Sequence, residues 1–443
     1  MINNIQKNIL NKQFTANIIS FLIFVIALML IYTVFLQVIG STPNAFHFIR
    51  YCAGLSAGMD SWNPMILALT HCKQFPDISI YQELLIENGI KFQYPPTSLL
   101  LFDIPERIFG IHYHMTATIY NAFSWVSGIL IVVFTSKMLT LVIEKYDFGQ
   151  FNLTSNKTPF LQFIIIGIIT VLFYPLIHSY RLGQIQTILT MLATLVLYYY
   201  LCDKKRVAGL CLGLICLVKP QLGLIFVWGL IRKEWLMVIS GCITIVAVLL
   251  PSILLYGFHN HWDYLAALSH LSRYGECFYA NQSVNGLMNR LLFNGNNLNW
   301  SGTAFPPFNL TVYVSTLFSS VILILFGLLW GCKNTKPNVI KLSIMMLCTT
   351  MASPIAWEHH YGILLPIFVL LSPFILYYYQ TSKWKIWMYA LAFVMASQYL
   401  SIVNKLANSY LNILQSYLYF AALVILAFLF LMTKKLNKCD MKE

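Results

Sequence analysis

The stretch "IISFLIFVIALMLIYTVFLQVI", residues 18–39, contains no charged residue over a length that suits a helix crossing a lipid bilayer. At 1.5 Å per residue, about 20 apolar residues cross roughly 30 Å of hydrocarbon. The stretch is longer than the apolar part of a secretory signal, and no small-residue cleavage site follows it. We therefore expect a helix that stays in the membrane.

Comparable apolar stretches recur along the chain, which is 58% hydrophobic and only 10% charged. Ordinary soluble domains have roughly a quarter of their residues charged. The sequence therefore predicts an all-α polytopic membrane protein with about 10–12 transmembrane helices. No linker, low-complexity tract or internal repeat divides it, so we expect one domain over residues 1–443. The expected crossings lie at residues 17–39, 115–140, 158–178, 184–201, 235–256, 309–331, 338–352, 361–378, 386–402 and 416–433.

A further apolar stretch, residues 207–231, is interrupted at Lys219 and Pro220. Proline lacks the donor for an interior helical hydrogen bond and clashes with the preceding turn. We expect a broken pair of half-crossings here. Such breaks usually line a site inside a membrane protein, because exposed backbone groups cannot face lipid.

The distribution of charge predicts the orientation. With both termini placed in the cytoplasm, the inner side holds most of the 28 Lys and Arg residues and a minority of the 15 acids, so the net charge of +13 lies entirely inside. The excess positive charge therefore reflects topology, and nucleic-acid binding loses its only support. The outer side receives two long loops, about 40–114 and 257–308, with a short amphipathic segment at 97–110 and shorter loops at 178–184, 219–221, 353–360 and 403–415.

The ten cysteines give little information about function, because most lie in or beside apolar stretches and no CxxC pair is present. Cys52 and Cys72 both lie in the first outer loop. A disulfide between them is an open alternative.

The unusual polar clusters all fall on the predicted outer side, and their convergence would form a site. Asp60, in "AGMDSWNPM" at 57–65, has apolar and aromatic neighbours that would raise its proton affinity and suit a general base. The alternative for Asp60 is a solvated or helix-capping acid. "SPIAWEHH", at 353–360, ends in one acid and two imidazoles.

Three cations, Arg181, Lys219 and Arg290, lie at the outer edges of apolar stretches. Each could simply extend its charged end to the lipid headgroups. Lys219 fits that alternative least well because it lies at a helix break. Together the three could hold an anionic phosphate.

His359 and His360 could relay a proton or donate hydrogen bonds. Adjacent histidines point to different faces of a helix, and no HExxH motif is present, so we rank a metal site below these roles. The remaining alternative is that the acid and the two histidines only cap a helix at the interface.

Six stretches follow one another along the chain: the loop acid, "FQYPP" at 92–96, "LGQIQTIL" at 182–189, "CLVKPQLGL" at 216–224, "NQSVNG" at 281–286 and "SPIAWEHH". In this order they resemble glycosyltransferase family 87, the polyprenol-phosphate-mannose-dependent mannosyltransferases of the GT-C class. The resemblance covers about residues 50 to 365. Gln186 stands where Asn is usual, Ala356 where Ser is usual, and Glu358 where Asp is common, which leaves the donor and acceptor undetermined. The spacing does not fix the catalytic acid, so Asp77 is an alternative to Asp60.

The resemblance implies an inverting transfer of a sugar, with mannose expected, from a polyprenyl-monophosphate donor to a hydroxyl of a lipid-linked or envelope glycan. Asp60 is expected to be the base, and His359 or His360 to steady the phosphate or relay a proton. No metal or cofactor is expected. The residues expected to bind substrate are Tyr94, Arg181, Gln184, Lys219, Asn281, Gln282, Arg290, Trp357 and Glu358.

The main alternative function is a transporter or flippase for a lipid-linked sugar, which would also have broken helices and intramembrane charge. A non-catalytic protein of envelope assembly is a second alternative, in which Asp60 and His360 would tolerate substitution. We expect a bacterial inner membrane, with the active site on its periplasmic or extracellular face, because no retention signal for the endoplasmic reticulum is visible. The expected partners are the sugar donor, a glycan or glycolipid acceptor and membrane lipids.

Overall fold

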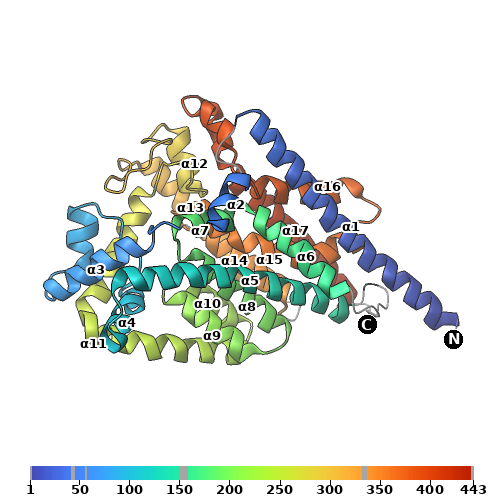
Figure 1. Ribbon diagram of the computed structural model, residues 1–443, viewed down its shortest axis with the longest axis horizontal. Coiled ribbons are helices and arrows are strands. Elements are labelled where there is room, and N and C mark those ends of the chain that lie inside the picture. The colour runs from blue at the N-terminus through green and yellow to red at the C-terminus, as the bar shows by residue number, and fades with distance from the viewer. Residues whose placement is uncertain are drawn as a thin grey trace.

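The computed structural model describes residues 2–40, 45–54, 57–146, 148, 158–331 and 337–440 (Figure 1). Within them the chain is helical and contains no strand, which confirms the predicted all-α class. Six of the described helices are long and apolar enough to cross a membrane. These are α1 (Ile2–Val38), α5 (Tyr113–Lys145), the first part of α11 (Trp235–Tyr274), α13 (Leu310–Leu329), α15 (Leu364–Tyr378) with the turn before it, and α17 (Tyr417–Asp440) with the turn before it.

Shorter helices complete the bundle and the loops. Because α15 is almost wholly buried while α13 and the first part of α11 are mostly exposed, α15 lies at the centre and the other two face outward. The remaining helices of the bundle are α6 (Thr158–Leu172), α7 (Tyr174–Leu182), α8 (Gln186–Leu201), α9 (Lys205–Cys216), α10 (Leu224–Ile231), α14 (Val339–Met351) and α16 (Lys383–Ala396). The loop helices are α2 (Ala45–Ala53), α3 (Trp62–Gln74), α4 (Leu100–Phe109) and α12 (Val284–Leu291).

Four predicted crossings differ from the structure. Those at 184–201 and 338–352 form the shorter apolar helices α8 and α14. The expected crossing at 158–178 is bent by 61° between α6 and α7. Phe173 leaves the helical conformation there, and Pro175 in the first turn of α7 cannot donate the hydrogen bond that would continue α6. The expected crossing at 386–402 ends earlier, because α16 stops at Ala396.

The predicted break at Lys219 and Pro220 is confirmed. Lys219 has an extended conformation between α9 and a short 3₁₀ turn, Pro220–Gly223, which leads into α10. A second break occurs in α11 at Gly257, whose positive φ of 77° is not helical. That residue is also where the second long outer loop was predicted to begin.

The two half-crossings are held by close packing of α9 against α11. Gly209 and Gly213 are four residues apart and face the start of α11, where Gly241 lies. A Cβ atom at Gly209 would overlap the carbonyl oxygen of Met237. Small residues at this spacing let two membrane helices approach closely, which is the main source of their association in lipid. The contact fixes the position of Lys219 at the end of α9.

The segment 97–110, predicted to dip into the outer interface, forms a 3₁₀ turn and the short helix α4. Asp103 is fully buried and binds Lys73 of α3 at 2.7 Å, Arg107 at 2.7 Å and the hydroxyl of Tyr256 at 3.0 Å. These bonds hold α4 between α3 and α11. Ile108, on the other face, is 67% exposed, as expected for an interfacial helix.

The open alternative of a Cys52–Cys72 disulfide is not supported. Cys72 is a free, buried thiol on α3. The side chain of Cys52 lies outside the described residues. The loop is instead held by the polar contacts described above and below.

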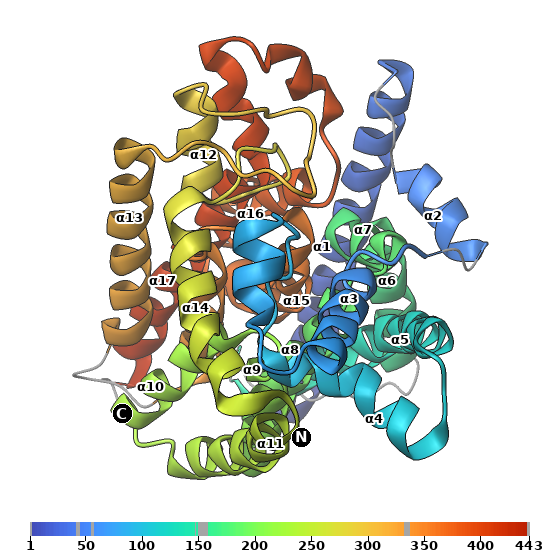
Figure 2. The same ribbon diagram turned by 90° about the vertical axis from the view of Figure 1, so that its left-hand side faces the viewer.

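Loops predicted to lie inside contact one another at one end of the bundle. Lys145 donates to the carbonyl of Leu201 at 2.8 Å, and Arg232 donates to the carbonyl of Gly331 at 2.7 Å. Both termini lie on the right-hand side of Figure 1, whereas α3 and α4 lie on the opposite side. Seen from that opposite side in Figure 2, the loop helices α3 and α12 face the viewer. These contacts join some of the segments that charge predicted to lie inside.

We expect Gly209→Ala to lower the unfolding temperature in detergent, because the new methyl group must push α9 away from α11 at a cost of about 1–3 kcal/mol. Gly128→Ala is the matched control, since an added Cβ there meets nothing within 4 Å. Thermal unfolding followed by tryptophan fluorescence measures both. Equal unfolding temperatures for the two variants would contradict the close helix contact.

Candidate active site

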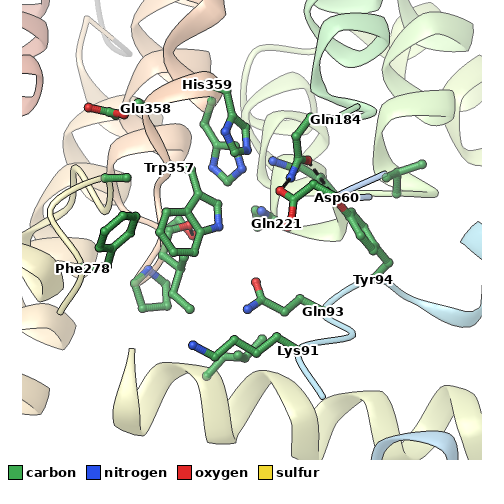
Figure 3. A pocket seen from close by; sticks show the side chains of 18 of the residues that line it. Asp60, Lys91, Gln93, Tyr94, Gln184, Gln221, Phe278, Trp357, Glu358 and His359 are labelled. Carbon is green, nitrogen blue, oxygen red and sulfur yellow. Dashed lines mark hydrogen bonds between the residues drawn. The ribbon is translucent and has the colours of Figure 1, made fainter. Parts of the chain in front are cut away.

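A cavity of about 610 Å³ lies among the loops that were predicted to be outside. Its walls come from several separate segments, including the first outer loop, the ends of α7 and α9 and the turn before α15. In Figure 3, Asp60 and Trp357 lie on opposite sides of the open space, with His359 above and Lys91 and Gln93 below. The volume is within the range of pockets that enclose small ligands.

Asp60 is placed by pairing of two backbone segments. The amides of Gly58, Asp60 and Ser61 donate to the carbonyls of Arg181, Leu182 and Gly183 at 2.8, 2.9 and 3.3 Å. Gly183 has a φ of +69°, and a Cβ there would overlap the carbonyl oxygen of Gly58. The glycine in "RLGQ" is therefore required for this close approach.

Gln184 orients the Asp60 carboxylate. Its side-chain nitrogen donates to Oδ2 of Asp60, and its side-chain oxygen accepts a hydrogen bond from Ser61 at 2.7 Å. The Ser61 hydroxyl also lies 2.8 Å from the hydroxyl of Tyr94. Burial raises the pKa of Tyr94, so its hydroxyl stays protonated and available as a donor.

Asp60 lines the cavity, and its surroundings change the proton affinity of its carboxylate. Its carboxylate is accessible from the cavity, yet desolvation raises its pKa above the ordinary value for aspartate, and the hydrogen bond from Gln184 offsets part of that rise. Asp77, the alternative acid, is exposed and does not line the cavity. The structure therefore favours Asp60.

The opposite wall is formed by the "SPIAWEHH" stretch, which is held by the loop at 276–283. Asn281 donates to the carbonyl of Pro354 at 3.1 Å and accepts from the amide of Ala356 at 2.9 Å. The amide of Gln282 donates to the carbonyl of Ala356 at 2.8 Å, and its side chain donates to the carbonyl of Gln415 at 2.7 Å. Asn281 and Gln282 are fully buried and support the wall without lining the cavity.

Three predicted residues, His359, His360 and Lys219, bring hydrogen-bonding groups to the cavity. His359 is buried, and its Nε2 has no hydrogen-bond partner among the described residues. The ring of His360 lies 4.8 Å from that of His359, measured between centroids. Lys219 also lines the cavity and forms no hydrogen bond or ion pair with the described residues through its side chain. This arrangement could bind an anion.

Trp357 and Glu358 point in different directions. The Trp357 indole reaches toward the open space, whereas the Glu358 carboxylate turns away from Asp60 (Figure 3). Glu358 is 1% exposed and accepts hydrogen bonds from Tyr174 at 2.7 Å and Tyr417 at 3.2 Å. Its geometry fits a residue that anchors the turn better than one that contacts substrate.

Arg290 does not lie where a phosphate-binding role requires it. It is fully buried outside the cavity lining, and its guanidinium donates to the carbonyls of Phe278 at 3.2 Å and Asn281 at 3.1 Å and to Ser416 at 2.6 Å. The structure thus corrects its predicted contact with substrate to a structural one. Arg181 is half-buried and also lies outside the lining, where its carbonyl pairs with Gly58.

The lining residues that the sequence analysis did not name include Lys91 and Gln93. Both precede Tyr94, so their proximity to the "YPP" element was the only local signal. Nζ of Lys91 donates a hydrogen bond to Oε2 of Glu276 at 2.6 Å, although the two residues are 185 positions apart in the sequence. No sequence pattern could pair them.

Among the described residues, no group of three or more His, Cys, Asp or Glu side chains is arranged so that it could hold a metal ion.

The fold and cavity define a multi-pass helical membrane protein in which an acid faces imidazoles and an ammonium group across an enclosed space. The family model of glycosyltransferase family 87 matches residues 92–354, and the chain belongs to this family. It is therefore a glycosyltransferase. Neither the curated proteins nor the solved structures include a match to the chain. The matched segment contains Tyr94, Gln184 and Lys219, while Asp60 and the two histidines lie outside it.

We expect Arg290→Gln to lower the unfolding temperature strongly, because the buried carbonyls that it binds would lose their donors at about 1–3 kcal/mol each. Lys219→Gln removes no hydrogen bond, so its unfolding temperature should match that of the unmodified protein. Thermal unfolding in detergent compares the two variants. A large loss of stability in Lys219→Gln would show that this residue has a structural role.

Proposed function

We propose that the protein is an inverting hexosyltransferase that moves a sugar, mannose being the expected one, from a polyprenyl-monophosphate donor to a hydroxyl of a glycan or glycolipid acceptor. The observation that supports this proposal best is the position of Asp60. It faces a cavity in which unpaired cationic and imidazole groups lie on another wall. An inverting transfer needs a base on one side of the anomeric carbon and an anion-binding group on the other.

Asp60 would accept the proton of the acceptor hydroxyl while that oxygen attacks the anomeric carbon. The bond between the anomeric carbon and the phosphate oxygen breaks at the same time, and its electron pair leaves with the polyprenyl phosphate. Gln184 holds the carboxylate in position through the hydrogen bond to Oδ2. One glycosidic bond forms, one glycosyl phosphate bond breaks, and the proton ends on Asp60.

Lys219 is our candidate for the group that holds the departing phosphate, with His359 or His360 as a hydrogen-bond donor or proton relay. The side-chain amine of Lys219 is not paired with any described residue, and burial lowers its pKa to about 7, so a bound phosphate would favour its charged form. The unpartnered Nε2 of His359 supplies a second contact from a buried position. Trp357, beside these groups, would contact the sugar. This scheme uses no metal or cofactor.

The outer face of a bacterial inner membrane is the proposed location, with both termini in the cytoplasm. The support is the bias of Lys and Arg toward one set of loops, together with the contacts that join some of those loops. A lipid-linked donor and lipid-linked or envelope glycans both meet the membrane surface there. We further propose that the chain acts as one domain, because the cavity needs segments from residue 60 to residue 360.

We expect Asp60→Asn to lower sugar transfer by about 10²–10⁴-fold, because the amide cannot accept the proton. The assay measures release of radiolabelled sugar from polyprenyl-phosphate-mannose by purified protein with host membrane lipids as the acceptor source. Asp77→Asn is the matched control and should retain full transfer, since Asp77 is exposed away from the cavity.

Full activity in Asp60→Asn would contradict the proposed mechanism, and loss only in Asp77→Asn would move the base to that residue. Donor binding is measured in parallel, so that a failure of chemistry is separated from a failure of binding. Donor that crosses liposome membranes without sugar release would instead identify a flippase.

The pH dependence of kcat/KM provides a second test of Asp60. The carboxylate must be charged to act as a base, and its pKa is raised by desolvation, so activity should fall on acidification at a pH above the usual range for aspartate. Gln184→Leu removes the hydrogen bond that lowers this pKa, and we expect the acidic limb to move to still higher pH. An unchanged limb in Gln184→Leu would show that Gln184 does not act on the base.

A further inference from the structure

We propose that the lower wall of the cavity, formed by Lys91, Gln93 and Trp300, is a binding subsite for an uncharged sugar of the acceptor. This inference rests on the proposed function and adds the chemical class of the second substrate. It follows from three features of the wall: its position relative to Asp60, its unused hydrogen-bonding groups and its charge.

The position of the wall places it on the acceptor side. In an inverting transfer the acceptor approaches opposite the leaving phosphate, with its hydroxyl at the base. Gln93 directly precedes Tyr94, which is linked through Ser61 to the Asp60 region. In Figure 3, Lys91 and Gln93 lie below Asp60, whereas His359 lies above it. An acceptor on the lower wall would therefore have its hydroxyl near Asp60 and remain clear of the phosphate end.

The wall offers groups that suit a sugar. The side-chain amide of Gln93 forms no hydrogen bond with the described residues, so both its donor and its acceptor are available. Trp300 presents an aromatic ring and an indole N–H that is likewise unbonded within the described part of the chain. A flat apolar face next to amide groups matches the C–H and hydroxyl groups of a hexose ring.

The charge of the wall favours an uncharged ligand. Lys91 is 2.6 Å from Glu276, and both side chains are almost fully buried. The Lys91 ammonium also lies 5.3 Å from the centre of the Trp300 ring and 4.7 Å from that of Phe305. Its charge is thus neutralised inside the protein, in contrast to that of Lys219. An anionic acceptor would find no unpaired cation on this wall. The free energy that the anion loses on leaving water would therefore not be recovered by an ion pair.

Saturation-transfer NMR with methyl mannoside tests the subsite. The protein is the full chain with Asp60→Asn, loaded with polyprenyl-phosphate-mannose so that the donor occupies its own place without turnover. We expect methyl mannoside to bind beside the donor, and Gln93→Ala and Trp300→Ala each to weaken that binding by about 5- to 10-fold. Mannose 6-phosphate should bind more weakly than methyl mannoside. Gln82→Ala and Trp262→Ala are matched controls, since both residues lie outside the cavity lining and should leave binding unchanged.

Gln93→Asn, which keeps the amide but shortens the side chain, provides a second variant if Gln93→Ala lowers the unfolding temperature. The inference is overturned if methyl mannoside does not bind, if donor displaces it, if mannose 6-phosphate binds more tightly, or if neither wall variant weakens binding. Donor binding is measured separately with radiolabelled donor. A protein that does not bind this donor contradicts the proposed function, and binding of methyl mannoside to the unloaded protein then tests the wall by itself.

Discussion

Backbone groups that leave a helix inside a membrane protein must find partners within the protein, because lipid offers none. This constraint accounts for the cavity. The chain leaves regular helix at Phe173, Lys219, Gly257 and the segment 353–357. Backbone groups beside two of these breaks bond to segments far away in the sequence: the amide of Tyr174 donates to the carbonyl of Ser397 at 2.9 Å, and the carbonyl of Ala356 accepts from the amide of Gln282 at 2.8 Å. The loops meet around a cavity lined by both polar and apolar side chains.

Some residues that hold the loops and some that line the cavity differ in the hydrogen bonds of their side chains. Arg290, Asn281 and Glu358 are buried and direct their polar atoms to carbonyls, amides or hydroxyls of the protein. Lys219 and Gln93 line the cavity and have no such bonds through their side chains within the described residues. A buried polar group without a partner is costly, so its retention beside a cavity is more easily explained by a ligand than by stability.

The family match and the cavity involve partly different parts of the chain. The family model ends at residue 354, before the two histidines, and begins at residue 92, after Asp60. Yet the structure brings Asp60 into a hydrogen bond with Gln184, which lies within the matched segment. The histidines reach the same cavity because Asn281, also in the matched segment, holds the turn before them. The cavity therefore combines residues from inside and outside the matched segment.

The sequence by itself determined the helical membrane class, most helix positions and the break at Lys219, since hydropathy, proline and the bias of charge act locally along the chain. It also identified Asp60 and the paired histidines as candidates. Only the tertiary structure separated Arg290 from the substrate site and revealed Lys91 with its partner Glu276. The physical reason is that the role of a polar side chain depends on whether the fold supplies a partner for it. Those partners come from segments far away in the sequence, where no local pattern can indicate them.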